Sequence, residues 1–386
     1  MWNNVKYFRS KGFNNRITIG NNVCTPKRFC FRRWVKRIFS YHSTCMLRPD
    51  LPHFGLKRER TGPPWKILFF GTDDFAVESL KKLSASRHGS SDRLVESLEV
   101  VTLDKELPVR KFANQNKLVV HDWPHIYPHG QFDVGVVVSF GCLLREGLIR
   151  QFPFGILNVH PSLLPRWRGP APVFHTILHG DAVTGVTIMQ IRPKRFDVGP
   201  ILSQEVYQVP EHCTVDQLGA TLATMGAHLL IDTLKTLPEK IASRREQAKE
   251  GATSAPKINT VMSWVDWEEQ TCEQIGRLFR AIGSRIPLRT IWMGDTVKLL
   301  EFCGEFNESV SEDRALSAGS VQYQKESNTL LVRCKDGWVG FRAVVLRKRL
   351  SAADFYNGYL HPFFTKKLPL QHRECVFQSK QVKPKD

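Results

Sequence analysis

Two short polar stretches of the chain hold side chains that could carry out acyl transfer. Asn158 and His160 are two residues apart in a predicted strand, so their side chains should lie on the same side of it. Asp197 begins the second stretch, Asp-Val-Gly. An amide can donate to a developing oxyanion, an imidazole can exchange protons near neutral pH, and a carboxylate can set the charge and tautomer of that imidazole. The three groups suit transfer of an acyl group to an amine, and no serine or cysteine nucleophile is needed if the attacking group belongs to the substrate.

Other residues with possible metal chemistry lack the required spacing. His175 and His179 are four residues apart, but the segment lacks the glutamate of H-E-x-x-H, so we interpret them as a pair on the surface of a helix. The nine cysteines include no C-x-x-C pair, so neither a zinc knuckle nor a redox motif has its spacing. We therefore expect no metal, and a reducing compartment is the simplest interpretation.

The elements that should position these residues alternate between strand and helix. Strands are predicted at 66–70, 98–103, 133–138 and 156–159, and helices at 74–83 and 109–117. This alternation predicts an α/β fold with a doubly wound, mostly parallel sheet. Such sheets bind ligands beyond the carboxyl ends of their strands, so residues 139–144 and the loop from His160 onward are expected to form the site. The turn after Gly71 lacks the further glycines of a dinucleotide fingerprint, and no phosphate loop occurs, which disfavours NAD and ATP.

The rest of the chain predicts a second, all-β region. Helical periodicity covers 214–237, and the polar segment 238–259 has the composition of a linker. A helix is then expected at 272–282. Short β-rich runs follow at 289–293, 297–302, 319–323, 329–334 and 338–346. Five short strands suggest a small barrel.

Charge is concentrated at the front of the chain. Residues 1–60 hold 14 basic and two acidic residues, and the net charge of the whole chain is +18. The first 49 residues hold no acidic residue and include a basic amphipathic pattern around Phe31, Trp34 and Ile38, which indicates a mitochondrial transit peptide. A nucleic-acid-binding arm or a membrane-surface helix is the alternative. Residues 257–386 are mildly basic, with 20 basic and 15 acidic residues, which fits a polyanionic partner.

Three motifs resemble those of a known family. They are the run NVHPSLLPRWRG at 158–169, GVTIMQ at 185–190 and DVG at 197–199. Together they resemble the methionyl-tRNA formyltransferases, which belong to the 10-formyltetrahydrofolate-dependent formyltransferases. The wider superfamily shares the Asn, His-Pro-Ser and Asp-x-Gly pattern, whereas Pro-Arg-Trp-Arg-Gly and Thr-Ile-Met-Gln are closer to the tRNA enzymes. The resemblance covers about residues 65–365.

The resemblance implies roles for individual residues. Asn158, His160 and Asp197 would be catalytic, and Arg166 and Arg168 are candidates for tRNA binding. A folate pocket would be lined by Phe140, Gly141, Ser162, Leu163, Leu164 and Pro165. The resemblance further implies 10-formyltetrahydrofolate as formyl donor and methionyl-tRNA as acceptor. A Rossmann-like catalytic domain would be followed by an OB-like barrel that contacts tRNA.

These expectations give a domain plan and leave alternatives open. The plan is a transit peptide at 1–60, a catalytic domain at 61–240, a linker at 241–260, an OB-like domain at 261–372 and a tail at 373–386. We expect a monomer in the mitochondrial matrix without stable membrane association. The alternatives are a folate-dependent formyltransferase for a small-molecule amine, such as glycinamide ribonucleotide, and a catalytically silent RNA-binding relative.

One segment departs from the family pattern. Bacterial members have a long, basic, glycine-rich loop after the second strand, whereas residues 103–111 here are few and nearly neutral. We therefore expect a different or looser mode of tRNA selection.

Overall fold

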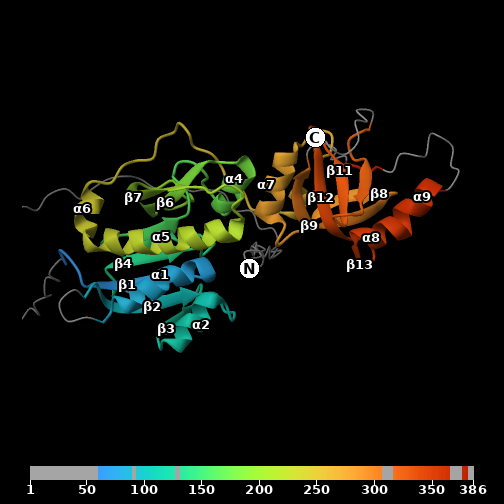
Figure 1. Ribbon diagram of the computed structural model, residues 1–386. Helices are drawn as coiled ribbons and strands as arrows, with labels where there is room; N and C mark the ends of the chain where they lie inside the picture. The colour runs from blue at the N-terminus through green and yellow to red at the C-terminus, as the bar shows by residue number, and fades with distance from the viewer. Residues whose placement is uncertain (1–59, 89–92, 127–130, 307–315, 366–375, 381–386) are drawn as a thin grey trace, which may run out of the picture. The chain divides into compact units, whose positions relative to one another are not determined.

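The computed structural model describes residues 60–88, 93–126, 131–306, 316–365 and 376–380 (Figure 1). The predicted transit peptide, apart from Arg60, lies outside the described residues. Strands and helices alternate in the first half of the described chain, and antiparallel strands dominate the second half.

The first half forms a seven-stranded sheet in the order β3-β2-β1-β4-β5-β6-β7. Five strands are parallel: β1 (Trp65–Gly71), β2 (Val95–Thr102), β3 (Val119–Asp122), β4 (Val134–Val138) and β5 (Ile156–His160). Two antiparallel strands, β6 (Val183–Gln190) and β7 (Ile201–Gln208), extend one edge. The doubly wound, mostly parallel sheet predicted from the sequence is thus confirmed, while β3, β6 and β7 were outside the prediction.

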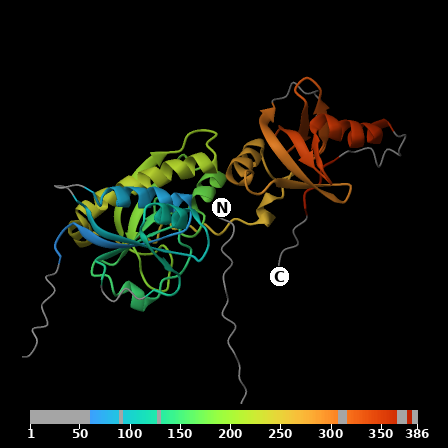
Figure 2. The same cartoon turned by 90° about the horizontal axis from the view of Figure 1, so that it is seen from below.

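Helices α1 (Asp74–Ala85), α2 (Pro108–Gln115) and α5 (Val215–Lys235) pack beside one another on the sheet (Figures 1 and 2). Asp73 caps α1, and a reciprocal capping box between Thr214 and Gln217 begins α5. A second apolar cluster joins strand residues to the segment after β4, which contains α3 (Glu146–Ile149). Apolar side chains of the helices and of the segment after β4 therefore both pack against the sheet. Two short helices, α4 (Pro172–His179) and α6 (Leu237–Ala242), complete this half.

Strand register aligns the ends that should carry the site. Gly71 of β1 pairs with Val138 of β4, and Val137 of β4 pairs with Asn158 of β5. The turn that starts at Ser139 therefore lies beside the end of β5. Parallel strands put all their carboxyl ends at one edge, which is where the sequence predicted the site loops.

The second half forms an antiparallel sheet in the order β10-β11-β12-β9-β8, with β13 paired to β12. Its strands are β8 (Leu288–Trp292), β9 (Asp295–Phe306), β10 (Val321–Gln324), β11 (Thr329–Arg333), β12 (Trp338–Val345) and β13 (Arg349–Ser351). Its helical segments are η1 (Thr260–Ser263), α7 (Cys272–Ile282), α8 (Ala352–Phe355), the π-helical turn η2 (Tyr356–Leu360) and α9 (His361–Thr365). The curvature of the strands is visible in Figure 2.

A C-terminal segment joins the two edges of this second sheet. Val376 bridges Ser320 next to β10, and Gln378 bridges Ile291 of β8. Phe377 between them is fully buried. The expectation of a tail from residue 373 is therefore wrong for residues 376–380, because an apolar side chain between two sheet edges holds the segment in place.

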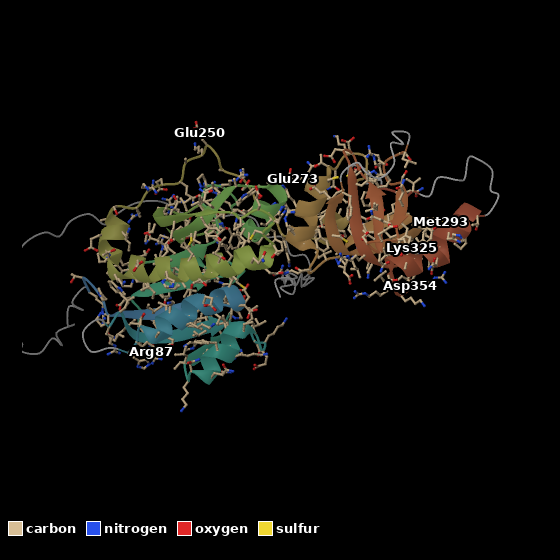
Figure 3. All side chains as sticks on the ribbon, viewed as in Figure 1. Arg87, Glu250, Glu273, Met293, Lys325 and Asp354 are labelled. Carbon is tan, nitrogen blue, oxygen red and sulfur yellow. The ribbon has the colours of Figure 1, made fainter. Side chains whose placement is uncertain are left out.

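Charged side chains and a few large apolar ones, such as Met293, lie on the outside of the described chain. Exposed charged side chains such as Glu250, Lys325 and Asp354 project from it (Figure 3). None of the helices in the described part of the chain combines the length and the apolar character needed to cross a bilayer.

Two glycines of α5 provide a matched test of how closely this helix packs on the sheet. A Cβ on Gly226 would lie 2.7 Å from Val159 of β5 and 3.2 Å from Val186 of β6, whereas one on Gly219 would meet nothing within 4 Å. Gly226→Ala should lower the free energy of unfolding by about 1–2 kcal/mol, because overpacking outweighs the gain in helix propensity. Gly219→Ala should instead raise it by up to about 1 kcal/mol. Urea unfolding measures both values, and equal effects of the two variants would contradict the packing described.

Candidate active site

The carboxylate of Asp197 joins the three predicted catalytic residues. Asn158 Nδ2 donates to Asp197 Oδ1 at 3.1 Å, and His160 Nδ1 lies 3.7 Å from the same oxygen. The other oxygen, Oδ2, accepts from the backbone N–H of Gly169 at 2.9 Å. Asp197 adopts φ 53°, a left-handed conformation that aspartate tolerates better than most residues. One carboxylate therefore contacts strand β5 and the loop that follows it.

The ring of His160 is buried and oriented from its other side. Only 4% of the residue is exposed, and Nε2 lies 2.9 Å from the carbonyl oxygen of Trp167. Because a carbonyl only accepts, Nε2 must carry the hydrogen of that bond. Nδ1 is thus the ring nitrogen that faces Asp197, and a protonated ring would direct a second N–H toward the carboxylate.

Trp167 is held in an unusual backbone conformation. Its φ is 63°, which is rare for a bulky side chain and costs of order 1–3 kcal/mol. Its backbone N–H donates to Thr253 Oγ1 at 2.9 Å, and its indole N–H donates to Asp181 at 2.7 Å. The guanidinium of Arg166 lies 4.3 Å from the ring centroid. These contacts fix the carbonyl that orients His160.

The two arginines predicted to bind tRNA both have partners within the chain. Arg166 donates from Nε and Nη2 to both oxygens of Asp181, at 2.8 and 2.5 Å, and its side chain is 42% exposed. Burial alone would raise the pKa of Asp181, but the hydrogen bonds from Arg166 and Trp167 lower it overall. Arg168 Nε donates to Gln247 Oε1 at 2.9 Å. Only part of each guanidinium is left for a ligand.

The segment predicted as a linker supports the site. Gln247 Nε2 donates to the carbonyl oxygens of Asp197, at 3.0 Å, and of Gly199, at 2.8 Å. On either side of Gly169, the Ala255 N–H donates to the Arg168 carbonyl at 2.7 Å, and the Ala255 carbonyl accepts the Ala171 N–H at 3.2 Å. A Cβ on Gly169 would lie 2.7 Å from the Ala255 oxygen, and φ is +124° there. Composition alone carried no sign of these contacts, so the sequence offered no signal for Gln247 or Thr253.

The predicted folate-pocket residues divide by exposure. Phe140 is buried, with its ring against Phe70 and Trp123. Ser162 and Leu164 are also buried, and the Ser162 hydroxyl donates to the Arg166 carbonyl at 2.7 Å. The remaining candidates are partly or fully exposed: Gly141, Leu163 and Pro165. The exposed group can contact a ligand, while the buried group shapes the loops that carry it.

The interpretation of His175 and His179 as a surface pair is wrong for His175. Its exposed fraction is 5%, and its Nε2 hydrogen-bonds the Pro256 carbonyl at 3.0 Å. Burial lowers the pKa of its imidazole. The rings of both histidines lie against Trp167, with centroids 5.4 and 4.5 Å away. The pair therefore packs against the residue that orients His160.

A buried carboxyl lies next to the turn after β4. The Thr72 hydroxyl donates to the Ser139 carbonyl at 2.5 Å, and Ser139 has φ 46°. Asp73 accepts the Ala76 N–H at 3.2 Å and is 8% exposed. Burial raises the pKa of Asp73 to about 7. The sequence indicated no role for this residue beyond its place in the turn after Gly71.

This arrangement can stabilise negative charge on an oxygen held next to Asp197. Asn158 has a second amide hydrogen beyond the one given to Asp197, and a protonated His160 has an N–H at Nδ1. A carboxylate between an amide and an imidazole also provides a proton acceptor. These are the parts required for acyl transfer to an amine.

Comparison with known proteins identifies relatives over both halves of the chain. A family model described as "Formyl transferase" matches residues 65–234, and one described as "Formyl transferase, C-terminal domain" matches residues 257–360. The mitochondrial methionyl-tRNA formyltransferase of Homo sapiens is 57% identical over 331 residues, which cover 83% of this chain and 85% of that protein. The methionyl-tRNA formyltransferase of Roseobacter denitrificans is 34% identical over 314 residues, covering 76% of this chain and 95% of the relative.

Solved structures share the fold. An N-formyltransferase from Helicobacter canadensis, in complex with folinic acid and dTDP-3-aminofucose, superposes with a TM-score of 0.53 at 17% identity. The match covers 74% of this chain and 99% of that one. At this identity, the likeness concerns the fold alone.

The raised pKa of Asp73 predicts a pH-dependent stability. The carboxyl titrates near 3.8 when unfolded and near 7 when folded, so the stability it contributes at low pH is lost as the pH rises through 7. In Asp73→Asn, the amide oxygen can still accept the Ala76 N–H, but the side chain carries no charge. At pH 8 this variant should exceed the wild type in unfolding free energy by roughly 1–4 kcal/mol, and the difference should shrink toward pH 5. Asp74→Asn, at the exposed neighbouring position, is the control for urea unfolding across this range. A difference for Asp73→Asn that is independent of pH would contradict the assignment.

Proposed function

Because the chain belongs to the family of methionyl-tRNA formyltransferases, we propose that Asn158, His160 and Asp197 form the active site at which it formylates methionyl-tRNA. The chain transfers a formyl group from a folate donor to the amine of the methionyl ester, for the initiation of mitochondrial translation. The observation that carries the site proposal is the Asp197 carboxylate, 3.1 Å from the Asn158 amide and 3.7 Å from the His160 ring.

In this proposal, Asn158 and His160 stabilise the formyl oxygen as it gains negative charge. Asn158 donates its second amide hydrogen, and His160 donates from Nδ1 in its protonated form. Trp167 holds the opposite side of the ring through the Nε2 hydrogen bond, so Nδ1 keeps its orientation during the reaction. Donors fixed in advance need little reorganisation when charge develops, which is the main source of their effect on the rate.

Asp197 has two roles in the same proposal. Its carboxylate lies 3.7 Å from His160 Nδ1 and orients the ring, and it accepts a proton from the attacking amine through a water molecule. The amine nitrogen forms a bond to the formyl carbon and loses a proton, while the bond from that carbon to the donor nitrogen breaks and that nitrogen gains a proton. No net proton is taken up, and no covalent enzyme intermediate is required.

The donor and its pocket follow from the same residues. We propose 10-formyltetrahydrofolate as the donor and a pocket formed by the turn at Phe140 and Gly141 and by the loop 162–165. Gly141, Leu163 and Pro165 would contact the ligand because they are at least partly exposed. Phe140, Ser162 and Leu164 would hold the walls from behind.

The acceptor requires a wider surface. We propose that residues 61–240 are the catalytic domain, that 241–260 connect it to the next domain, and that 261–372 contact tRNA phosphates. Arg166 and Arg168 remain candidates for the acceptor end, in addition to their contacts with Asp181 and Gln247. We further propose a monomer that works in the mitochondrial matrix without stable membrane association.

Substitution of His160 tests the site. His160→Ala should lower kcat for formylation by about a hundredfold or more, because it removes an oxyanion donor, while the Kd for methionyl-tRNA stays near that of the wild type. The measurement combines steady-state formylation of charged tRNA with a binding assay. His228→Ala, at an exposed position on α5, serves as the control and should keep full activity.

Three outcomes would contradict the proposal. Unchanged kcat in His160→Ala would remove the imidazole from the mechanism. If the wild-type chain binds methionyl-tRNA but forms no N-formylmethionine, it is a catalytically silent RNA-binding relative. Transfer to a small amine without transfer to charged tRNA would indicate the remaining alternative.

The short connection between β2 and α2 predicts loose selection of tRNA. Arg110, in the first turn of α2 next to this connection, donates from Nη2 to Asp122 and to the Leu103 carbonyl, so that nitrogen is not available for a base or phosphate. Initiator tRNA variants with a paired or an unpaired first acceptor position should therefore be formylated with kcat/KM values within about tenfold of each other, or about 1.4 kcal/mol. Formylation assays on the two charged tRNAs measure this ratio, and a much larger preference would contradict loose selection.

A further inference from the structure

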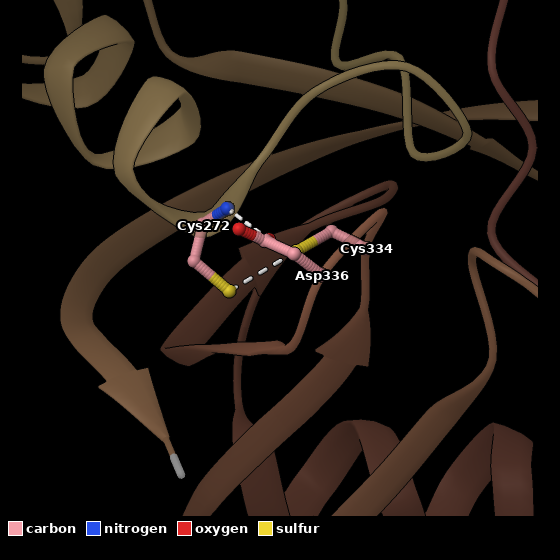
Figure 4. Close-up of side chains that lie close together, drawn as sticks. All are labelled: Cys272, Cys334 and Asp336. Atoms are coloured by element: carbon pink, nitrogen blue, oxygen red, sulfur yellow. Dashed lines mark hydrogen bonds between the residues drawn. The ribbon is translucent and has the colours of Figure 1, made fainter. Parts of the chain in front are cut away.

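Two cysteines that are 62 residues apart in sequence meet in the antiparallel half of the chain. Cys272 is the first residue of α7, and Cys334 directly follows β11. Their sulfur atoms are 3.2 Å apart, and the carboxylate of Asp336 lies next to both residues (Figure 4). The exposed fractions of the cysteines are 6% and 2%, whereas Asp336 is exposed.

A tight turn positions Cys334 beside Cys272. The Cys334 N–H donates to the Gly337 carbonyl at 2.9 Å, which closes the turn. The Cys334 sulfur lies 3.4 Å from the same carbonyl oxygen, and the Cys272 sulfur lies 3.6 Å from the Trp338 carbonyl oxygen. Both sulfurs are therefore held in place by backbone contacts of this turn and of the start of β12.

The Asp336 carboxylate beside the two sulfurs carries a negative charge that no basic side chain in the described turn neutralises. Asp336 Oδ1 accepts the backbone N–H of Cys272 at 2.8 Å and lies 3.7 Å from the Cys334 sulfur. The adjacent cations have other partners: Lys335 Nζ lies 3.5 Å from Glu269, and the Arg333 guanidinium lies over the Trp338 ring. The three donor groups therefore converge where a cation would be favourable.

We propose that Cys272, Cys334 and Asp336 bind one zinc ion, with water as the fourth ligand. Two sulfurs and one carboxylate oxygen are ligands that zinc accepts in tetrahedral sites. Their ligand atoms lie within 4.8 Å of one another. With Zn–S bonds of about 2.3 Å, a tetrahedral site separates the sulfurs by about 3.8 Å, so they need to move apart by roughly half an ångström.

Metal binding accounts for the carboxylate and the burial better than oxidation of the cysteines does. A disulfide would need an oxidant such as a peroxide to reach a sulfur that is 2% exposed, and it would leave the negative charge of Asp336 beside the sulfurs without a cation. Zinc can enter as the domain folds, so burial of both sulfurs does not hinder it. Binding displaces the thiol protons to solvent and changes no oxidation state.

The expected result of this site is a cross-link between α7 and the β11–β12 turn. A ligand that binds only the folded chain stabilises it in proportion to the logarithm of its concentration over Kd. The expectation of no metal rested on the absence of closely spaced cysteines, and this pair is assembled by the fold instead. The inference does not depend on the proposed active site.

Metal analysis of the purified full chain tests the proposal. Chain produced with zinc and then dialysed should retain one zinc ion per chain, as measured by inductively coupled plasma mass spectrometry. Cys272→Ser and Cys334→Ser should each lose it. Cys303→Ser, which changes a half-buried cysteine outside the cluster, is the matched control and should retain it. Cobalt(II) added to the metal-free wild-type chain should produce thiolate-to-metal charge-transfer absorption, which does not require any variant to fold.

A further variant addresses the carboxylate. Asp336→Asn keeps an oxygen to accept the Cys272 N–H, so it should fold, and it should raise the Kd for zinc by about tenfold or more. The proposal is overturned if the wild type neither retains zinc nor gives the cobalt absorption. It is also overturned if thiol titration shows that these two cysteines are oxidised and are restored by reductant, because they would then be a disulfide pair.

Discussion

The structure of the site depends on one carboxylate, that of Asp197. Its two oxygens accept hydrogen bonds from the Asn158 side chain and the Gly169 backbone, and its charge faces His160. Hydrogen bonds to a charged group contribute about 1.5–3 kcal/mol each, and the cost of leaving a buried charge unpaired is larger still. Strand β5, the loop 161–171 and the turn at 197–199 are therefore fixed relative to one another by the group that we propose as the proton acceptor.

Strained backbone surrounds this carboxylate, and the neighbouring segment opposes the strain. Asp197, Trp167 and Ser139 all have positive φ, each at a cost of order 1–3 kcal/mol. Gln247 and Thr253 bond two of these residues from the segment after α6. Gly199 allows the necessary close approach, since a Cβ there would lie 1.7 Å from the Gln190 oxygen. These contacts offset the backbone strain and keep the Trp167 carbonyl hydrogen-bonded to Nε2 of His160.

Sequence patterns predicted the parts of this fold whose physics is local. Strand β4 is a continuous apolar run and β1 is apolar from Ile67 to Phe70, because both faces of these strands are buried. In β5, period two places Asn158 and His160 on one side. Strands β6 and β7 form the antiparallel edge of the sheet, and periodicity did not separate them from loops. Gln247, Phe377 and the pair Cys272–Cys334 act through contacts with residues far along the chain. Composition cannot reveal such partners, so a polar linker, a tail and scattered cysteines were the natural interpretations.

The most direct test of the central claim is kcat for formylation of methionyl-tRNA by Asp197→Asn. An asparagine can accept only one of the two hydrogen bonds now made by the carboxylate, and it cannot accept the proton of the attacking amine. The account predicts a loss in kcat of at least about a hundredfold, with little change in KM for tRNA. A kcat close to that of the wild type, in a variant with the wild-type circular dichroism spectrum, would contradict it.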